Sequence, residues 1–199
     1  MSQSTRTNEV EAAAQLINGG FSLAKKSMEQ ILQTPIAIER IEYDDQALDR
    51  FALVGGNEVH LLKTELKGEL AGACYLIFAN DDVEKINHAC LPLDISSGKS
   101  ADSELMKVEF LKEIDNILAA SVITEFANAL EILAYGDVPS LVSIPSSTLH
   151  KYIESEIKKN ETVIHSRAIF HGPALSISPH FIWIFQDELL DKIKNISNN

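Results

Sequence analysis

Cysteines, basic side chains and long apolar runs are all scarce in this sequence of 199 residues. The two cysteines, Cys74 and Cys90, stand among apolar residues with no CxxC or Cys/His spacing, which predicts buried reduced thiols rather than a disulfide or a metal site. The chain has 17 Lys and Arg residues against 29 Asp and Glu residues, a formal net charge of −12. Because an acidic surface repels phosphate backbones and anionic lipid, this charge argues against nucleic-acid and membrane partners.

No apolar stretch reaches the roughly 18 residues that a membrane span requires. The longest stretches, residues 74–79 and 181–185, are short and typical of strands. The first residues also lack the basic and then apolar pattern of a signal peptide. We therefore expect a cytoplasmic protein without membrane insertion.

Histidines and glycines form no pattern typical of a ligand site. The glycine pairs at 19–20 and 55–56 lack the surroundings of a phosphate-binding loop. The histidines have no metal-ligand spacing and are expected on the surface or in turns; they are His60, His88, His150, His165, His171 and His180. We therefore expect no metal, and no cofactor of the protein's own.

Apolar periodicity predicts two long helices, over residues 8–33 and from about 102 to 134. The pair Gly19-Gly20 interrupts the first, at a cost of about 1 kcal/mol per glycine, which suggests that another surface approaches closely there. Gly136 and Pro139 are expected to close the second helix.

Shorter elements are expected between and after the long helices. A helix through Cys90, capped by Asn80 or Asp81, precedes a linker at 91–101. A polar helix at 147–159 has no counterpart in the first half, so it is either a connecting helix or an insertion that binds a partner. Strands are expected at 36–42, 51–54, 58–66, 70–79, 140–144, 161–170 and 174–185, and a last helix at 187–196.

The two halves of the chain resemble each other. Residues 75–86 (YLIFANDDVEKI) align without a gap on residues 182–193 (IWIFQDELLDKI), and both segments run from an apolar strand into an acidic first turn of a helix. The long helices also align. We therefore expect one domain over residues 1–199, with half-repeats at about 8–91 and 102–196. The predicted fold is α/β (α+β): a pseudo-twofold repeat of helix, strands and helix, with a mainly antiparallel sheet and the two long helices on one face.

A polar row follows one face of the second long helix. Its members are spaced i, i+4, i+7 and i+11, and they are Glu109, Glu113, Asn116 and Ala120. The opposite stripe is apolar and is expected to face the core. E-x-x-N occurs twice elsewhere in the chain, but only Asn116 is followed 23 positions later by a proline, Pro139. On residue frequencies alone, the alternative is an ordinary solvated helix face.

This pattern resembles the signature of the CheC/CheX/FliY family of chemotaxis phosphatases: Asp or Ser, three residues, Glu, two residues, Asn, 22 residues, Pro. The resemblance extends over about residues 10–193. Glu109 departs from it, because the family has Asp or Ser at this position. On the first helix Glu11 aligns with Glu109 and Asn18 is kept, but Gln15 replaces the expected Glu and no proline follows at the required distance. We interpret this first site as degenerate.

The resemblance implies hydrolysis of the aspartyl phosphate on a CheY-like response regulator, in chemotaxis or two-component signalling. The regulator supplies its own Mg²⁺ and a lysine, so the remaining need is a water held in line with the leaving oxygen. Asn116 would orient that water and Glu113 would pair with the lysine. Glu109, Ala120 and Pro139 are expected to contact the partner.

Two other roles and the oligomeric state stay open. One role is a non-catalytic binding module, because the middle domain of the flagellar switch protein FliM has this fold without the phosphatase residues. The other is an adaptor for a CheD-type deamidase. The chain could also work as a homodimer. The sequence does not identify the regulator.

Overall fold

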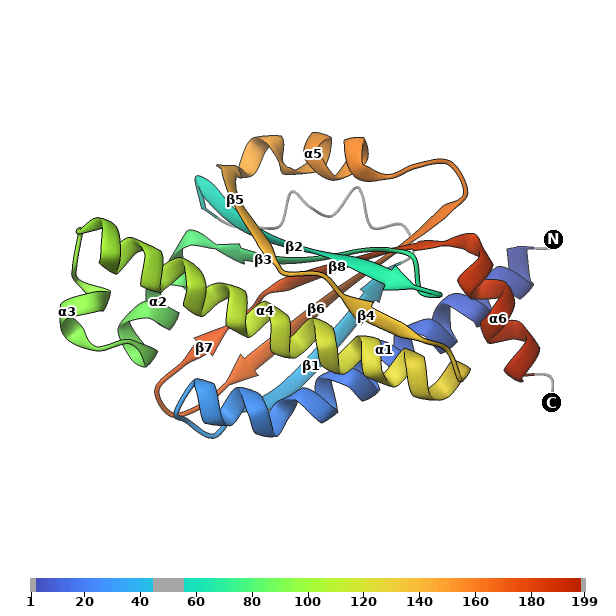
Figure 1. Ribbon diagram of the computed structural model, residues 1–199, viewed down its shortest axis with the longest axis horizontal. Helices are drawn as coiled ribbons and strands as arrows, with labels where there is room; N and C mark the ends of the chain where they lie inside the picture. The colour runs from blue at the N-terminus through green and yellow to red at the C-terminus, as the bar shows by residue number, and fades with distance from the viewer. Residues whose placement is uncertain (1–2, 45–55, 198–199) are drawn as a thin grey trace.

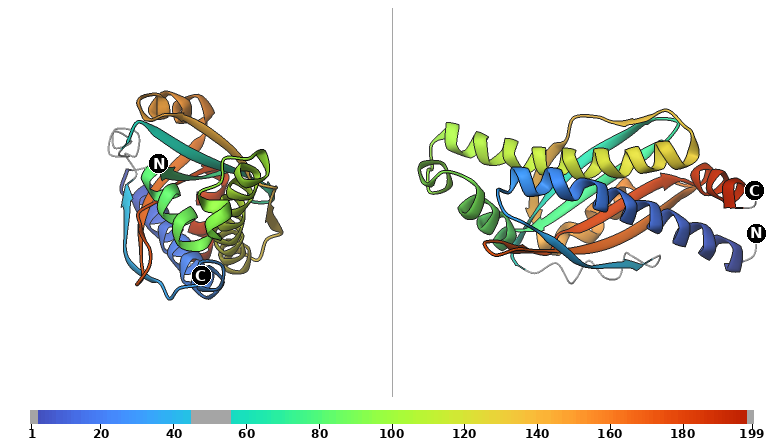
Figure 2. Two further views of the ribbon diagram at one scale, coloured as in Figure 1. Left: turned by 90° about the vertical axis from the view of Figure 1, so that its left-hand side faces the viewer. Right: turned by 90° about the horizontal axis from the view of Figure 1, so that it is seen from below.

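An antiparallel sheet carries two long helices side by side on one face (Figures 1 and 2). The computed structural model describes residues 3–44 and 56–197. The helices are α1 (Gln3–Ile31), α2 (Asn80–Cys90), α3 (Leu93–Ser96), α4 (Ala101–Leu130), α5 (Leu149–Glu156) and α6 (Asp187–Ser197), with a short 3₁₀ helix η2 (Ser146–Thr148). The strands are β1 (Ala37–Asp44), β2 (Glu58–Gly68), β3 (Gly72–Ala79), β4 (Ala134–Gly136), β5 (Ser140–Pro145), β6 (Glu161–His171), β7 (Ser176–Ile177) and β8 (His180–Gln186).

The sheet order is β1-β6-β8-β3-β2-β4, with β5 also paired to β2 and β7 to β6. The central strands β3 and β8 are the two strands whose sequences align, and each continues directly into a helix, α2 or α6. Tyr75 and Ile182, which head the two aligned segments, are also direct partners in the antiparallel register. Such a pairing is expected when a pseudo-twofold axis passes between the two strands. The predicted fold class is therefore confirmed, whereas the half-repeat boundaries stay a prediction.

The two long helices touch at a glycine. A Cβ on Gly20 would lie 2.4 Å from the Cα of Val122, so a larger residue would force α1 away from α4. This contact accounts for the glycine pair that interrupts the first helix. The main core lies between these helices and the sheet, and Trp183, Phe126 and Phe21 are among its fully buried side chains.

A second, smaller core covers the opposite face of the sheet. There α5 packs on the strands through Leu149 and Ile153, both fully buried (Figure 2, left). Lys63 Nζ and the Tyr75 hydroxyl both donate to Glu156 Oε2, at 2.7 and 2.6 Å. The segment expected as a helix at 147–159 therefore covers the back of the sheet, which favours a connecting role over a partner-binding insertion.

The structure corrects several expectations. The helix α4 ends at Leu130, where Glu131 adopts a left-handed conformation, and Gly136 and Pro139 lie beyond it. The reason is tertiary: residues 134–136 pair with β2 as strand β4. Neither Asn80 nor Asp81 caps α2, because Ala79 occupies the N-cap position without a side-chain hydrogen bond. The linker contains the short helix α3, residues 174–185 form two strands, and the strand expected at 51–54 lies outside the described residues.

Two further expectations concern single side chains. Cys74 and Cys90 are both buried free thiols, as predicted. His165 and His180 are buried rather than placed on the surface, with Nε2 of the first 2.9 Å from Nδ1 of the second. Among the helices of residues 3–44 and 56–197, none has the length and apolar character needed to cross a membrane.

Candidate functional site

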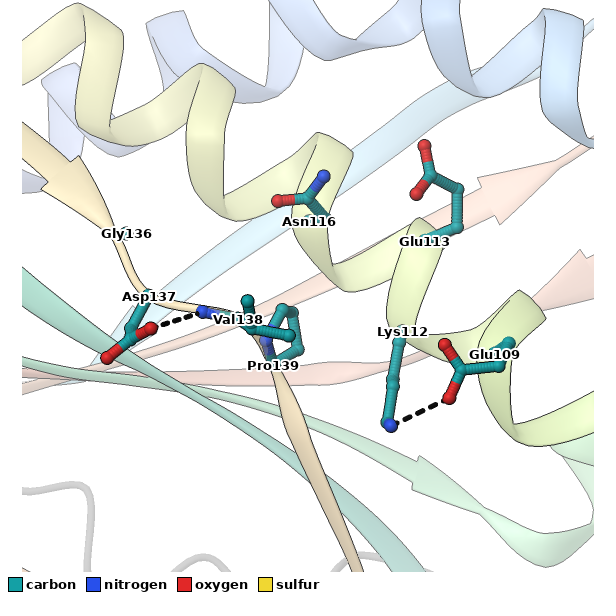
Figure 3. A pocket seen from close by; sticks show the side chains of 8 residues that line it. All are labelled: Glu109, Lys112, Glu113, Asn116, Gly136, Asp137, Val138 and Pro139. Atoms are coloured by element: carbon teal, nitrogen blue, oxygen red, sulfur yellow. Dashed lines mark hydrogen bonds and ion pairs between the residues drawn. The ribbon is translucent and has the colours of Figure 1, made fainter. Parts of the chain in front are cut away.

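The polar row of α4 faces a hollow beside the segment that joins β4 to β5. Glu109, Glu113 and Asn116 are all exposed and project from α4, while Pro139 lies across from them (Figure 3). The hollow measures about 510 Å³, including space open to solvent. It is lined by Glu109, Lys112, Glu113, Asn116, Gly136, Asp137, Val138 and Pro139.

The opposite face of α4 explains why the row points outward. Its apolar stripe is fully buried against the sheet and α1, which sets the rotation of the helix about its axis; the stripe consists of Leu111, Ile114, Leu118, Val122 and Phe126. The helix begins at a capped end, where the Ser103 amide donates to Ser100 Oγ (3.1 Å). Glu109 and the residues that follow it at i+4, i+7 and i+11 are therefore directed to solvent.

Between Asn116 and Pro139 the chain runs away from Asn116 along α4 and then turns back toward it. From Asn116 the chain follows α4 to Leu130, about 21 Å at 1.5 Å per residue. It then comes back along the extended segment from Ile132 to Pro139, about 23 Å at 3.3 Å per residue. Pro139 is buried, and its place in the hollow depends on this returning segment.

The segment from Gly136 to Pro139 lies close to both the sheet and α4. A Cβ on Gly136 would lie 2.9 Å from Thr64 Cγ2 and 3.1 Å from Ile123 Cδ1, so a side chain there would displace its neighbours. The Asp137 amide donates to the Glu65 carbonyl (2.9 Å), and the Val138 amide donates to Asp137 Oδ1 (2.8 Å). These contacts hold the segment beside Asn116.

Charge in the hollow is divided unequally. Lys112 Nζ pairs with Glu109 Oε1 at 2.8 Å (Figure 3). Within the described part of the chain, Glu113 and Asn116 have no side-chain hydrogen bond or ion pair. The Glu113 carboxylate and the Asn116 carboxamide are therefore open to an incoming group.

A second hollow, of about 540 Å³, adjoins the first and shares Asn116 and Gly136 with it. Ala120, exposed one turn further along α4, also lines it, together with Thr64 and Tyr135. Asn116 therefore stands between two depressions, and the small side chain of Ala120 leaves the second one open.

Directly behind the row lies a buried acid that the sequence analysis missed. Asp115 is 1% exposed and accepts a hydrogen bond from Thr64 Oγ1 at 2.6 Å. Burial raises its pKa from 3.8 to about 7, against the opposing effect of the Thr64 hydrogen bond. The signal was present in the sequence: an aspartate between Leu111 and Leu118 at helical spacing falls on the apolar face. Lys112 and Thr64 were also missed, and neither has such a signal.

The residues of the first site lie on α1. Glu11 and Gln15 are exposed and Asn18 is half-buried, so the row points outward as its counterpart on α4 does. Gln15 brings no charge to this row. The equivalent of Pro139 would be Ile41 in β1, whose side chain lies outside the described set.

No group of three or more His, Cys, Asp or Glu side chains that could hold a metal ion occurs in the described ranges, residues 3–44 and 56–197. The acids of the hollow are spread along α4 and beside Pro139 rather than converging on one point. The hollow therefore offers hydrogen-bonding and charged side chains to whatever binds there.

Solved structures share this mixed α/β fold with its curled antiparallel sheet. FliY from Thermotoga maritima has a TM-score of 0.64 at 14% identity, over 98% of this chain and 96% of that one. The FliM middle domain from H. pylori has a TM-score of 0.55 at 9% identity, over 96% and 99%. A chain of the CheX-CheY-BeF3-Mg complex from Borrelia burgdorferi has a TM-score of 0.50 at 15% identity, over 84% and 96%.

The chain thus has the fold of FliY, CheX and the FliM middle domain, and the structural resemblance predicted from the motif is confirmed. At these identities the similarity establishes a shared fold. No protein-family model matches the sequence, and a search of curated proteins finds no match.

Proposed function

We propose that this protein hydrolyses the aspartyl phosphate of a CheY-like response regulator. The observation that carries the proposal is the arrangement of one hollow: an exposed carboxamide and an exposed carboxylate, both without partners in the described chain, lie beside a buried proline at the family spacing. The shared fold supports it, because that fold includes CheX, which was crystallised with CheY, BeF3 and Mg²⁺.

Asn116 would orient the attacking water. The carboxamide oxygen accepts a hydrogen bond from water, and the amide nitrogen can donate to a phosphoryl oxygen. The water oxygen then bonds to phosphorus, the bond between phosphorus and the aspartyl oxygen breaks, and the aspartate leaves as a carboxylate while the water's protons pass to phosphate and solvent. Since the acyl phosphate is already activated, positioning the water is the main contribution required of this protein.

Glu113 would pair with the regulator's lysine. Lys112 already neutralises Glu109, and Asp137 shares Lys67 with Glu65, its Oδ2 lying 3.9 Å from Lys67 Nζ. Glu113 therefore leaves the hollow acidic and suited to an incoming cation. Exposed apolar side chains lie at Val138, which lines this hollow, and at Tyr135, which lines the adjoining one. An acidic centre with apolar flanks favours a protein partner over a small anion. On this proposal Mg²⁺ belongs to the regulator.

The experiment compares Asn116→Ala with Asn128→Ala. Asn128 is a matched control, because it is exposed on the same helix and belongs to another E-x-x-N match, Glu125 to Asn128. Release of phosphate from a phosphorylated CheY-like regulator should slow by about 100-fold or more in Asn116→Ala, because a misplaced nucleophile costs about that much. Asn128→Ala should keep the wild-type rate. Equal rates for the two variants would rule out the assignment.

A non-catalytic binding module is the second candidate. Two observations favour it: Glu109 replaces the short Asp or Ser of the family and is held by Lys112, and the FliM middle domain shares the fold over nearly the whole chain. One solved relative is a FliG-FliM complex. A binder would protect or ignore the phosphoryl group, whereas a phosphatase would remove it. The CheD-type adaptor role and the homodimer stay predictions from the sequence.

A further inference from the structure

Only one of the two carboxyl oxygens of the buried Asp115 has a hydrogen-bond partner in the described chain. Its Oδ2 accepts from the Thr64 hydroxyl at 2.6 Å, whereas Oδ1 is buried and has no hydrogen-bond partner in the described chain. Leaving a buried polar atom unpaired is costly, and the apolar neighbours Ile114 and Leu118 show that an aliphatic residue would suit this face of α4. An arrangement that costs stability next to a candidate catalytic residue suggests a role in the site.

Thr64 connects three parts of that site. It lies on β2, its hydroxyl holds Asp115 on α4, and its methyl group meets Gly136 at the end of β4. It also lines the second hollow together with Asn116. The helix that carries Asn116 and the segment that carries Pro139 thus both contact the same side chain of the sheet, that of Thr64.

We propose that Asp115 and Thr64 form a buried strut that positions Asn116 relative to Pro139, which makes both of them positioning residues for the reaction. This inference rests on the hydrolysis proposed above. The hydrogen bond has a fixed direction, whereas the apolar contacts of α4 permit small sliding and rotation. Asp115 directly precedes Asn116, so a shift of the strut moves the carboxamide that holds the water.

The test uses Thr64→Val, which keeps the shape of the side chain and removes the hydroxyl. We expect the hydrolysis rate at saturating regulator to fall by about 10-fold, because a displacement of up to 1 Å costs as much as 100-fold. The affinity for the beryllofluoride-activated regulator should stay within about 2-fold, because Glu113 and the apolar flanks are untouched. Thr64→Ser restores a hydroxyl and should recover most of the rate.

Thr162→Val is the matched control. Thr162 on β6 donates to Asp187 Oδ1 on α6 at 2.6 Å, the same pair of residue types at the same distance, outside both hollows. This variant should keep the wild-type rate. A second variant, Thr64→Val with Asp115→Leu, removes both polar groups and leaves none unpaired, so it tests the strut in a folded protein even if Thr64→Val alone unfolds.

A readout without hydrolysis separates the strut from the reaction. The side-chain NH₂ signals of Asn116, followed by NMR in the free protein, should shift in both Thr64 variants that lack the hydroxyl and stay in place in Thr162→Val. If these signals shift but the wild-type protein hydrolyses nothing, the proposed function fails and the strut stands. Unshifted signals, or a wild-type saturated rate in the folded double variant, would overturn the positioning role.

Discussion

At the scale of single residues, the energetic outlier is Asp115. Its pKa is about 7 in the folded chain, against an ordinary value of 3.8, because burial disfavours the charged form. Because the pKa is raised, the folded state binds the Asp115 proton more tightly than the unfolded state does. Below about pH 4 the carboxyl is protonated in both states, so it has no electrostatic effect on stability. As the pH rises from about 4 toward 7, only the unfolded state loses the proton readily, and the free energy of unfolding falls.

Asp115→Asn should therefore stabilise the protein at pH 8. The amide can still accept from Thr64 and never ionises, and a shift of about three pH units corresponds to at most about 4 kcal/mol. Denaturant unfolding of both proteins at several pH values measures the difference, which should shrink toward zero near pH 4. Two stability curves that run parallel from pH 4 to pH 8 would contradict the raised pKa.

Glu113 is the residue whose charge should matter for docking. Glu113→Lys should weaken binding to the activated regulator by about 10-fold, the equivalent of one hydrogen bond to a charged group, and the loss should be largest at low salt. Glu58→Lys is the control, because it makes the same change of net charge at an exposed position outside the hollow. Isothermal titration at two salt concentrations makes the comparison. Equal affinities for the two variants at both concentrations would argue against the ion pair.

At the scale of elements, the sequence predicts what depends on local periodicity. The two long helices and the outward face of Glu109, Glu113 and Asn116 follow from apolar spacing alone. The end of α4 does not, because residues 134–136 leave the helix to pair with β2, a partner about 70 residues earlier in the chain. The same distant pairing brings Pro139 to Asn116. Periodicity within the helix could suggest the motif but not the hollow.

Gly136 tests how closely these elements must approach. Gly136→Ala would place a Cβ 2.9 Å from Thr64 Cγ2, so β4 or Thr64 has to move. We expect a loss of about 1–3 kcal/mol in the free energy of unfolding, as for other overpacked sites, together with slower hydrolysis because Pro139 shifts with the strand. Denaturant unfolding and phosphate release, measured on the same preparation, check both. Unchanged values for both would show that the segment adapts freely.

At the scale of the whole molecule, internal similarity predicts the layout. The aligned segments form the adjacent central strands β3 and β8, with Tyr75 opposite Ile182. What the repeat does not predict is the asymmetry: α5 covers the back of the sheet from the second half, where Leu149 packs without a counterpart visible in the first-half sequence. Asymmetric additions have no repeat pattern, so only the structure reveals them. The loss of the acid at Gln15 is a similar departure, and under the proposed function it leaves α4 as the working row.

Phosphate release from a phosphorylated CheY-like regulator, with and without a substoichiometric amount of this protein, is the decisive measurement. Release should accelerate and continue over many turnovers, with the regulator's own Mg²⁺ as the metal present. A rate that stays unchanged or slows as the protein is added would contradict hydrolysis and identify a binding module instead.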